Sequence, residues 1–531
     1  MEADSTKDTP TQTAADVTEG MGKTVGRGGF LLAASSIGAR GLSFLVQIVL
    51  GYLLAKEDFG VFAIALSVAT FAQLLRDGGV QQVLIQRGEK DYDELRGPAF
   101  WLAMTFNLIA GVAIVAATPI IVRLYGEKVS HLTWIIAAWI PFSTPACLYR
   151  TRFLMLIQMD RVAQMQIGVA FIRAASVLSL ALLGFGAYSF VIPYLITTVF
   201  ETAFGYHYTR EIPWAHGFGV RLWRTLFSTT RWLMLSTLAS GLNLQGAYLV
   251  LGYFLSSDLV GVFFFGYQLA TQFTILVAWN FFSALFPVLS RLTGQPERRH
   301  AALMRSIRAV MFVCAPVSLA LVAVIAPLEA LIWGGKWAAS VPCVIALGVL
   351  IPFRGALFVS FADLQAQGRF RLYGLIELTH ALGLMSVAGA ASYFWGTAES
   401  VSWAVGLFLG AAGLGLTVAL SRRGGGRLSD ILASIGGSWL VSVVIAAICL
   451  AVDRFLLQDS SSLVRVGVES AIFAALSWIT MRTLLKRDAM DLVRAVPRRI
   501  GRLLAIALRL EFEPISPAPV AQQIAGAESP R

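Results

Sequence analysis

Charged residues are scarce in this chain: they make up 14% of its 531 residues, while hydrophobic residues make up 57%. An ordinary soluble domain carries about 25% charged residues, so the composition excludes a large soluble domain. Apolar runs of roughly 20 residues, the length that crosses a bilayer core of about 30 Å, recur along almost the whole chain. The sequence therefore predicts an all-α integral membrane protein that crosses the membrane many times.

Sequence signatures of catalysis are also missing. The four cysteines lie in separate apolar runs, without the close spacing of a metal site or a redox pair. Gly22-Lys23-Thr24 looks like the end of a phosphate-binding loop, but Val17 stands where that motif requires glycine. The sequence contains no nucleophile elbow and no cluster of metal ligands. We therefore predict a protein that is not an enzyme and that binds no cofactor and no metal.

The formal net charge of +11 comes from basic residues that fall in alternate loops, which argues against nucleic acid as a partner. Lys- and Arg-rich short loops lie on the cytoplasmic side of a membrane, so both termini are predicted to be cytoplasmic. The basic set of loops holds Arg87, Lys90, Arg96, Arg150, Arg152, Arg161, Arg210, Arg221, Arg224, Arg291, Arg298, Arg299, Arg369, Arg371, Arg422, Arg423 and Arg427. The other set holds little beyond Lys56, Arg123, Lys128, Lys336, Arg454 and Arg465.

One segment occurs twice. VLGYLLAKEDFGVF, Val49 to Phe62, aligns without a gap on VLGYFLSSDLVGVF, Val250 to Phe263, and Gly-Tyr and Gly-Val-Phe recur at one spacing. Such a match indicates an internal duplication. Because each copy contains an even number of predicted helices, the two copies share one orientation and are related by an axis along the membrane normal.

We predict about fourteen transmembrane helices: two six-helix lobes related by the repeat, followed by two C-terminal helices. Residues 1–27 form a disordered cytoplasmic N-terminus, 28–208 the N-lobe, 209–421 the C-lobe, 422–485 the last two helices, and 486–531 a basic amphipathic tail with a disordered end. The predicted helices cover about 28–54, 60–86, 98–122, 132–149, 164–185, 188–208, 226–255, 259–289, 308–333, 337–365, 372–395, 401–420, 431–457 and 463–485. Gly406 and Gly410, four residues apart, predict close helix packing.

Polar side chains form stripes on the first two helices of each copy, at the spacing that places residues on one helix face. We expect these stripes to line a wet central cavity. They comprise Ser36, Arg40, Ser43 and Gln47; Thr70, Gln73 and Asp77 with Arg76 beside them; Ser236, Ser240 and Asn243; and Gln268, Thr271 and Gln272.

Four arginines, Arg40, Arg76, Arg173 and Arg354, lie within apolar spans. A charge at the bilayer centre costs about 2.5 to 3.5 kcal/mol on the insertion scale, so these side chains must face protein or water. One interpretation pairs them with the intramembrane acids Asp77, Glu201, Asp363 and Glu377. The other assigns them to the substrate, because the guanidinium fork suits phosphate oxygens. Arg40 favours the second interpretation, since its helix carries no acid near it.

Two stretches resemble a known family. EDFGVFAIALSVATFAQLLRDGGVQQVLIQRG, Glu57 to Gly88, is similar to the N-terminal signature of bacterial polysaccharide transporters, the O-antigen and exopolysaccharide flippases of the multidrug/oligosaccharidyl-lipid/polysaccharide exporter superfamily. FPVLSRL, Phe286 to Leu292, resembles the end of helix 8 in that family. The likeness extends over about residues 28–485.

The resemblance implies two six-helix lobes in a V shape in the bacterial inner membrane. The implied substrate is an undecaprenyl-diphosphate-linked oligosaccharide, moved from the cytoplasmic to the periplasmic leaflet for exopolysaccharide, capsule or O-antigen synthesis. Implied partners are this lipid, the bilayer, and polysaccharide polymerase and export proteins. An ion gradient would drive transport, with Asp77 or Glu377 binding the coupling ion.

Three alternatives stay open on the sequence. A multidrug and toxin exporter would place acids, rather than Arg40, in the central cavity. A peptidoglycan-precursor flippase would share the diphosphate chemistry, and the signature disfavours it. A non-transporting scaffold for the polysaccharide assembly machinery would tolerate the loss of Arg40.

Overall fold

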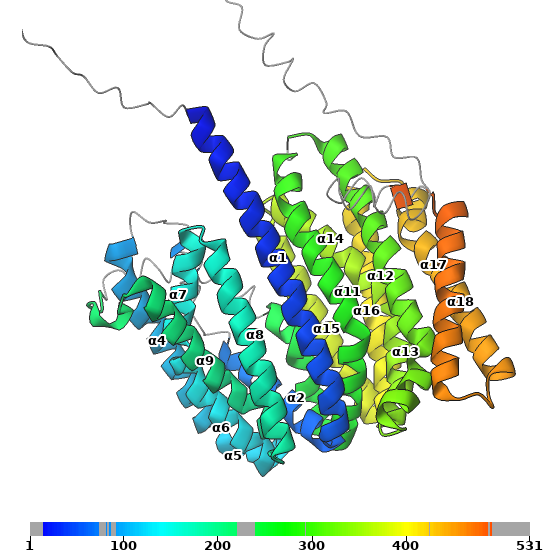
Figure 1. Cartoon of the computed structure of the whole chain (residues 1–531), viewed down its shortest axis with the longest axis horizontal. Coiled ribbons are helices and arrows are strands. Elements are labelled where there is room, and N and C mark those ends of the chain that lie inside the picture. Colours follow the sequence, from blue (N-terminus) through cyan, green and yellow to red (C-terminus); the bar gives the residue numbers. More distant parts are fainter. Residues whose placement is uncertain are drawn as a thin grey trace, which may run out of the picture. The chain divides into compact units, whose positions relative to one another are not determined.

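The computed structural model describes residues 14–73, 81, 84–85, 92–219, 223, 239–292, 294–423, 425–486 and 489–490. Contacts divide the chain into two compact units, Met1–Gly261 and Val262–Arg531. All the regular structure of the described residues is helical (Figure 1). Within them, nine helices are long and apolar enough to cross a membrane, or up to eleven if each of two bent pairs is one span. The predicted count of fourteen stays a prediction, since the spans at 60–86 and 226–255 run into residues outside these ranges.

The first unit contains eight labelled helices and a further helix at 239–254, which was predicted to open the second lobe. α1 packs against α8, α8 against α9, and α6 against α2 and α4 (Figure 1). The labelled helices are α1 (Ala14–Leu53), α2 (Lys56–Gln73), α4 (Tyr92–Ala116), α5 (Thr118–Tyr125), α6 (Glu127–Phe142), α7 (Thr144–Met155), α8 (Met159–Leu182) and α9 (Tyr188–Thr209), with the short η3 (Pro213–Ala215) after them.

α1 begins at Ala14, well before the predicted start near residue 28. A helix of 40 residues is about 60 Å long, roughly twice the thickness of a bilayer core. The apolar span within it covers Ala34–Leu53. The first half of α1 is therefore polar helix outside the apolar span, in a stretch that composition alone assigned to disorder.

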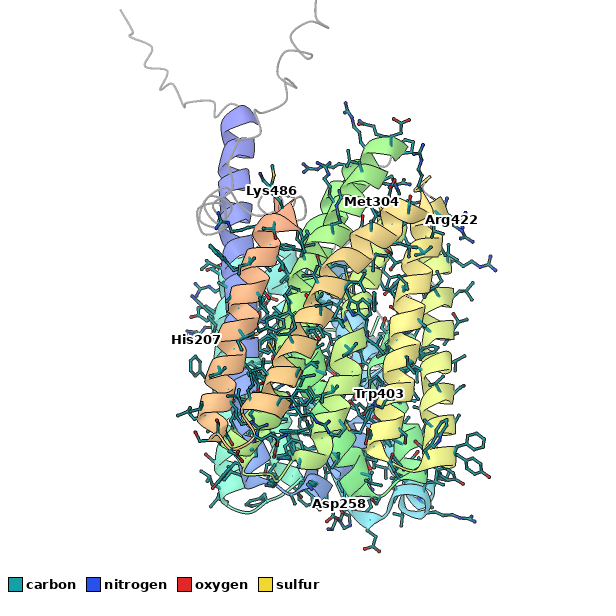
Figure 2. The ribbon with its side chains drawn as sticks, turned by 90° about the vertical axis from the view of Figure 1, so that its right-hand side faces the viewer. His207, Asp258, Met304, Trp403, Arg422 and Lys486 are labelled. Carbon is teal, nitrogen blue, oxygen red and sulfur yellow. The ribbon has the colours of Figure 1, made fainter. Side chains whose placement is uncertain are left out.

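The second unit is arranged around α12 (Pro296–Trp333), which packs against α13, α14, α17 and α18. Leu303, Ile307 and Val310 of α12 belong to a fully buried apolar cluster that also includes residues of α11, α14 and α17. In Figure 2, Met304, Arg422 and Lys486 lie toward the same end of this unit. The remaining elements are α11 (Ser257–Arg291), which begins in the first unit, η4 (Ala338–Ser340), α13 (Val341–Leu350), α14 (Pro352–Ala366), α15 (Phe370–Trp395), α16 (Ala398–Arg423), α17 (Leu428–Leu456) and α18 (Ser462–Thr483).

The fourth predicted helix of each copy is broken, which corrects the prediction of single helices at 132–149 and 337–365. α6 and α7 meet at 47°, and α13 and α14 meet at 43°. Proline removes a backbone donor and clashes with the preceding turn. Pro141 and Pro145 flank the first break, and Pro352 opens α14 directly after the second.

The repeated segments touch each other at two glycines that occupy equivalent places in them. A Cβ atom on Gly60 would lie 1.8 Å from the carbonyl oxygen of Ser257, and one on Gly261 would lie 1.9 Å from that of Lys56. Lys56 and Ser257 are themselves equivalent in the alignment. The crossing of α2 with the first turn of α11 is therefore reciprocal. The predicted duplication stays a prediction.

Glu211, just after α9, holds together three segments of the first unit. Its carboxylate accepts hydrogen bonds or ion pairs from Arg152, from Arg96 at 3.4 Å and from the Tyr92 hydroxyl at 3.3 Å. The Tyr149 hydroxyl donates to its backbone oxygen at 2.8 Å. The side chain is 17% exposed, so solvent screens these contacts only partly.

Glu211→Gln is expected to lower the unfolding free energy by about 2 kcal/mol, because two neighbouring arginines then lose their shared counter-charge. The thermal unfolding midpoint of the purified protein in detergent measures the effect. Asp93→Asn is the matched control: Asp93 also contacts Arg96, at 3.3 Å, but its side chain is 82% exposed. Equal midpoints for the two variants would contradict the structural role of Glu211.

Candidate substrate-contacting residues

The start of the polar stripe of α1 contacts α8, whereas Ser43 is exposed and donates to the Ala39 backbone oxygen of its own helix at 2.9 Å. The Ser35 hydroxyl donates to Gln166 Oε1 at 3.5 Å, and Gln166 Nε2 donates to the Ser36 hydroxyl at 3.1 Å. Gln47 has a buried Nε2 without a hydrogen-bond acceptor among the described residues. Ser36, the first residue of the predicted stripe, is therefore used for packing inside the first unit.

Arg40, one turn after Ser36, is partly buried and makes no hydrogen bond or ion pair with a described residue. Arg173 on α8 is also partly buried, and its guanidinium carbon lies 4.6 Å from the ring centroid of Tyr194 on α9. Its Nε is buried without a described acceptor. Both arginines therefore carry their charge at positions where the described side chains supply no acid.

A groove of about 490 Å³ lies between α1 and α8. Its walls are mostly small or apolar, with Asp160 and Gln164 among the few polar members. The α1 residues that line it, including Gly38, Ala39 and Leu42, lie on both sides of Arg40 in the sequence. No atom would lie within 4 Å of a Cβ on Gly38, so the groove is open at this point.

Arg354 lies in the first turn of α14, directly after the break that Pro352 introduces, and is 5% exposed. Its Nη1 donates to the Tyr267 hydroxyl of α11 at 2.6 Å, and the Phe358 ring lies 5.9 Å from its guanidinium carbon. His380 of α15, also 5% exposed, is close enough for an electrostatic interaction with Arg354. His380 was not among the residues predicted to contact the substrate.

The contacts of Asp363, the candidate partner of Arg354, do not support an ion pair between these two residues. Asp363 instead pairs with Arg299 at 3.2 Å and accepts a hydrogen bond from Gln367 Nε2 at 2.6 Å. Glu377 is 5% exposed and accepts a hydrogen bond from the Tyr373 hydroxyl at 3.4 Å. Its predicted role in binding a coupling ion stays a prediction.

The remaining predicted residues are distributed as follows. Asn243 is buried, while Gln268 and Gln272 are partly exposed on one face of α11. Arg76 and Asp77 lie outside the described residues, as does the side chain of Gln73. Tyr267 was missed by the sequence reasoning, although a hydroxyl-bearing aromatic inside an apolar span is a residue that needs a polar partner. The predicted central cavity stays a prediction.

The described residues form many long apolar helices, two of which are broken within the span. They also place three arginines within apolar spans without a described acid partner. Together these features indicate a polytopic membrane protein of the transporter class. The chain belongs to the family described as "Polysaccharide biosynthesis protein", whose model matches residues 49–342. The predicted resemblance to polysaccharide transporters is confirmed, and this is a multi-pass membrane protein of the kind that bacteria place in the inner membrane.

Two curated relatives cover most of the chain. The succinoglycan biosynthesis transport protein ExoT of Rhizobium meliloti is 24% identical over 492 residues, which is 85% of this chain and 96% of the relative. The teichuronic acid biosynthesis protein TuaB of Bacillus subtilis is 21% identical over 337 residues, 61% of this chain and 68% of the relative. The first relative is thus a transport protein of polysaccharide biosynthesis, and the second is a biosynthesis protein for another polysaccharide.

Solved structures share the fold. The Lipid II flippase MurJ in an inward closed conformation matches with a TM-score of 0.65 and 14% identity, covering 86% of this chain and 100% of that one. An inward-facing multidrug resistance MATE family transporter of the MOP superfamily matches with a TM-score of 0.58 and 14% identity, covering 74% and 95%. At these identities the likeness concerns the fold alone.

Proposed function

We propose that this protein moves an undecaprenyl-diphosphate-linked oligosaccharide across the bacterial inner membrane during polysaccharide synthesis. The observation that carries the proposal is the set of three intramembrane arginines, Arg40, Arg173 and Arg354, none of which pairs with an acid among the described residues. A buried charge without a counter-charge is costly. A diphosphate supplies that counter-charge when the substrate is bound, and guanidinium groups bind phosphate oxygens bidentately.

The groove between α1 and α8 supports the same proposal. A polyprenyl chain needs an apolar surface, and the groove provides one on the helix that carries Arg40. A substrate with an anionic diphosphate and an apolar tail would thus find both kinds of contact along α1. Organic cations, the substrates expected of a multidrug exporter, would be repelled by Arg40 and Arg173.

Deleting the gene in its host tests this function. The expected result is that one lipid-linked repeat unit accumulates and secreted polysaccharide is lost, because the unit stays in the cytoplasmic leaflet. Mass spectrometry of extracted lipids identifies the cargo, so a peptidoglycan precursor would be recognised by its own mass. Unchanged polymer together with increased sensitivity to cationic drugs would replace this proposal with the multidrug function.

Complementation with Arg40→Ala separates a transporter from a scaffold. We expect at least about tenfold less polymer at equal protein level, because a charge-assisted bond to phosphate is worth about 1.5 to 3 kcal/mol. Arg40→Lys keeps the charge and is expected to restore part of the activity. Arg454→Ala, at an exposed position, is the control and should complement fully. Full complementation by Arg40→Ala would favour the scaffold.

A further inference from the structure

The C-terminal hairpin of α17 and α18 contains a polar cluster in an otherwise apolar setting. Arg465 of α18 forms a bidentate ion pair with Asp453 of α17. The Arg465 Nε donates to Asp453 Oδ1 at 2.7 Å, and the Arg465 Nη2 donates to Asp453 Oδ2 at 2.6 Å. Both residues lie inside helices apolar enough to span a membrane. The two helices pack on each other and on α12, as the orange hairpin in Figure 2 shows.

Glu469 lies one helical turn after Arg465 and is 0% exposed. Neither of its carboxylate oxygens accepts a hydrogen bond from a donor among the described residues. Among the described residues, the side chain that interacts with this carboxyl is Asp453, which is itself a carboxyl. Two ionised carboxylates have no proton to share, so a hydrogen bond between them exists only when one of them is protonated.

Among the described residues, Arg465 is the only positive charge that approaches Glu469. From α17, the titratable groups that approach it are Asp453 and Cys449, whose thiol donates to the Glu469 backbone oxygen at 3.7 Å. From α18 itself the charged neighbour is Arg465. The adjoining part of α12 contributes Leu319, Val322 and Ala323 to an apolar cluster that also contains Cys449 of α17 and Phe473 of α18.

The charges of the cluster decide which ligand it can take. Arg465 neutralises one carboxylate, so ionising both acids would leave one negative charge in an apolar site. A hard metal cation such as Ca²⁺ takes six to eight oxygen ligands. The described residues contain no group of three or more acidic, Cys or His side chains arranged to hold a metal. A proton needs only one carboxylate oxygen and a neighbouring acceptor, and both are present.

We propose that Glu469 is a proton-binding site, with Asp453 as the acceptor of its acidic hydrogen and Arg465 as the residue that keeps Asp453 ionised. The proton is held while α17 and α18 remain packed. Opening the hairpin to water would release it, because the pKa of a solvated glutamic acid is about 4.3, so the group is ionised at neutral pH. The site uses none of the arginines that are proposed to contact the substrate, so its protonation does not depend on which substrate is transported.

Infrared spectroscopy of the full-length protein in lipid bilayers tests the proposal through the carbonyl stretch of protonated carboxyl groups, followed between about pH 5 and about pH 9. We expect a band from one protonated carboxyl at neutral pH in the unmodified protein, and Glu469→Gln should remove it. Glu399→Gln, which removes an exposed acid, should leave the band unchanged. A band that survives in Glu469→Gln would overturn the assignment.

Two further variants test whether Glu469 is protonated if Glu469→Gln does not fold. Asp453→Asn frees Arg465 to pair with Glu469, so Glu469 should ionise and the band should disappear although Glu469 is still present. Arg465→Gln leaves two acids without a cation, so both should be protonated and the band should grow about twofold. Unchanged bands in both variants would show that Glu469 holds no proton.

Discussion

Gly60→Val is expected to abolish transport and to reduce the yield of folded protein severely. A side chain at this position would begin 1.8 Å from the carbonyl oxygen of Ser257, far inside van der Waals contact, and the obstacle is backbone rather than a side chain that can rotate away. The crossing of α2 and α11 must therefore separate. Overpacking in well-packed cores costs about 1 to 3 kcal/mol and occasionally more, and a backbone clash belongs at the upper end.

Fluorescence-detected size exclusion and the thermal unfolding midpoint measure this effect. Gly415→Val is the matched control, since it makes the same change inside α16 where no atom lies within 4 Å of the added Cβ. Because the contact is reciprocal, Gly261→Val should behave like Gly60→Val, and the double variant should be little worse than either single one. A midpoint for Gly60→Val equal to that of Gly415→Val would refute the tight crossing.

Arg354→Leu is expected to eliminate transport without lowering the unfolding midpoint. The guanidinium is 5% exposed and its described contacts are a hydroxyl and an aromatic ring, so its burial is an uncompensated cost that leucine removes. Leucine also fills most of the volume. A protein that keeps such a charge at the expense of stability uses it for function.

Accumulation of the lipid-linked unit and the unfolding midpoint, measured on the same variant, check this prediction. Tyr267→Phe is the control: it removes the acceptor of the Arg354 hydrogen bond, keeps the charge, and should reduce transport only partly. Loss of stability together with loss of transport in Arg354→Leu would mean that Arg354 is structural. Full activity would remove it from the substrate pathway.

Features that depend on spacing within one helix could be predicted from the sequence. Gly406 and Gly410 predicted a close approach, which is confirmed: a Cβ on Gly406 would lie 2.9 Å from the Ala346 carbonyl oxygen, and one on Gly410 would lie 3.1 Å from Leu350. The bends were missed because hydropathy averages over a window and gives little weight to a single residue such as Pro352. The rule for proline was sufficient to place them.

Pairings between distant parts of the chain could not be predicted in the same way. Tyr267 and Arg354 are 87 residues apart, and periodicity gives no information about which buried donor meets which acceptor. Glu469 is a different case. It stands four residues after Arg465 inside a predicted span, so the rule that intramembrane acids need a partner would have found it.

The polar cluster of the last hairpin also constrains how the chain is made. α18 leaves the ribosome after α17 and carries two arginines and a glutamate. Inserting a charged residue into lipid costs about 2.5 to 3.5 kcal/mol at the centre of a helix, and less near the helix ends, where both arginines lie. The bidentate ion pair between Arg465 and Asp453 offsets part of that cost only if α17 already lies beside α18. Lateral release of the two helices as one hairpin is therefore the favourable route of biogenesis, and a stop codon between them would leave Asp453 in the bilayer without its cation.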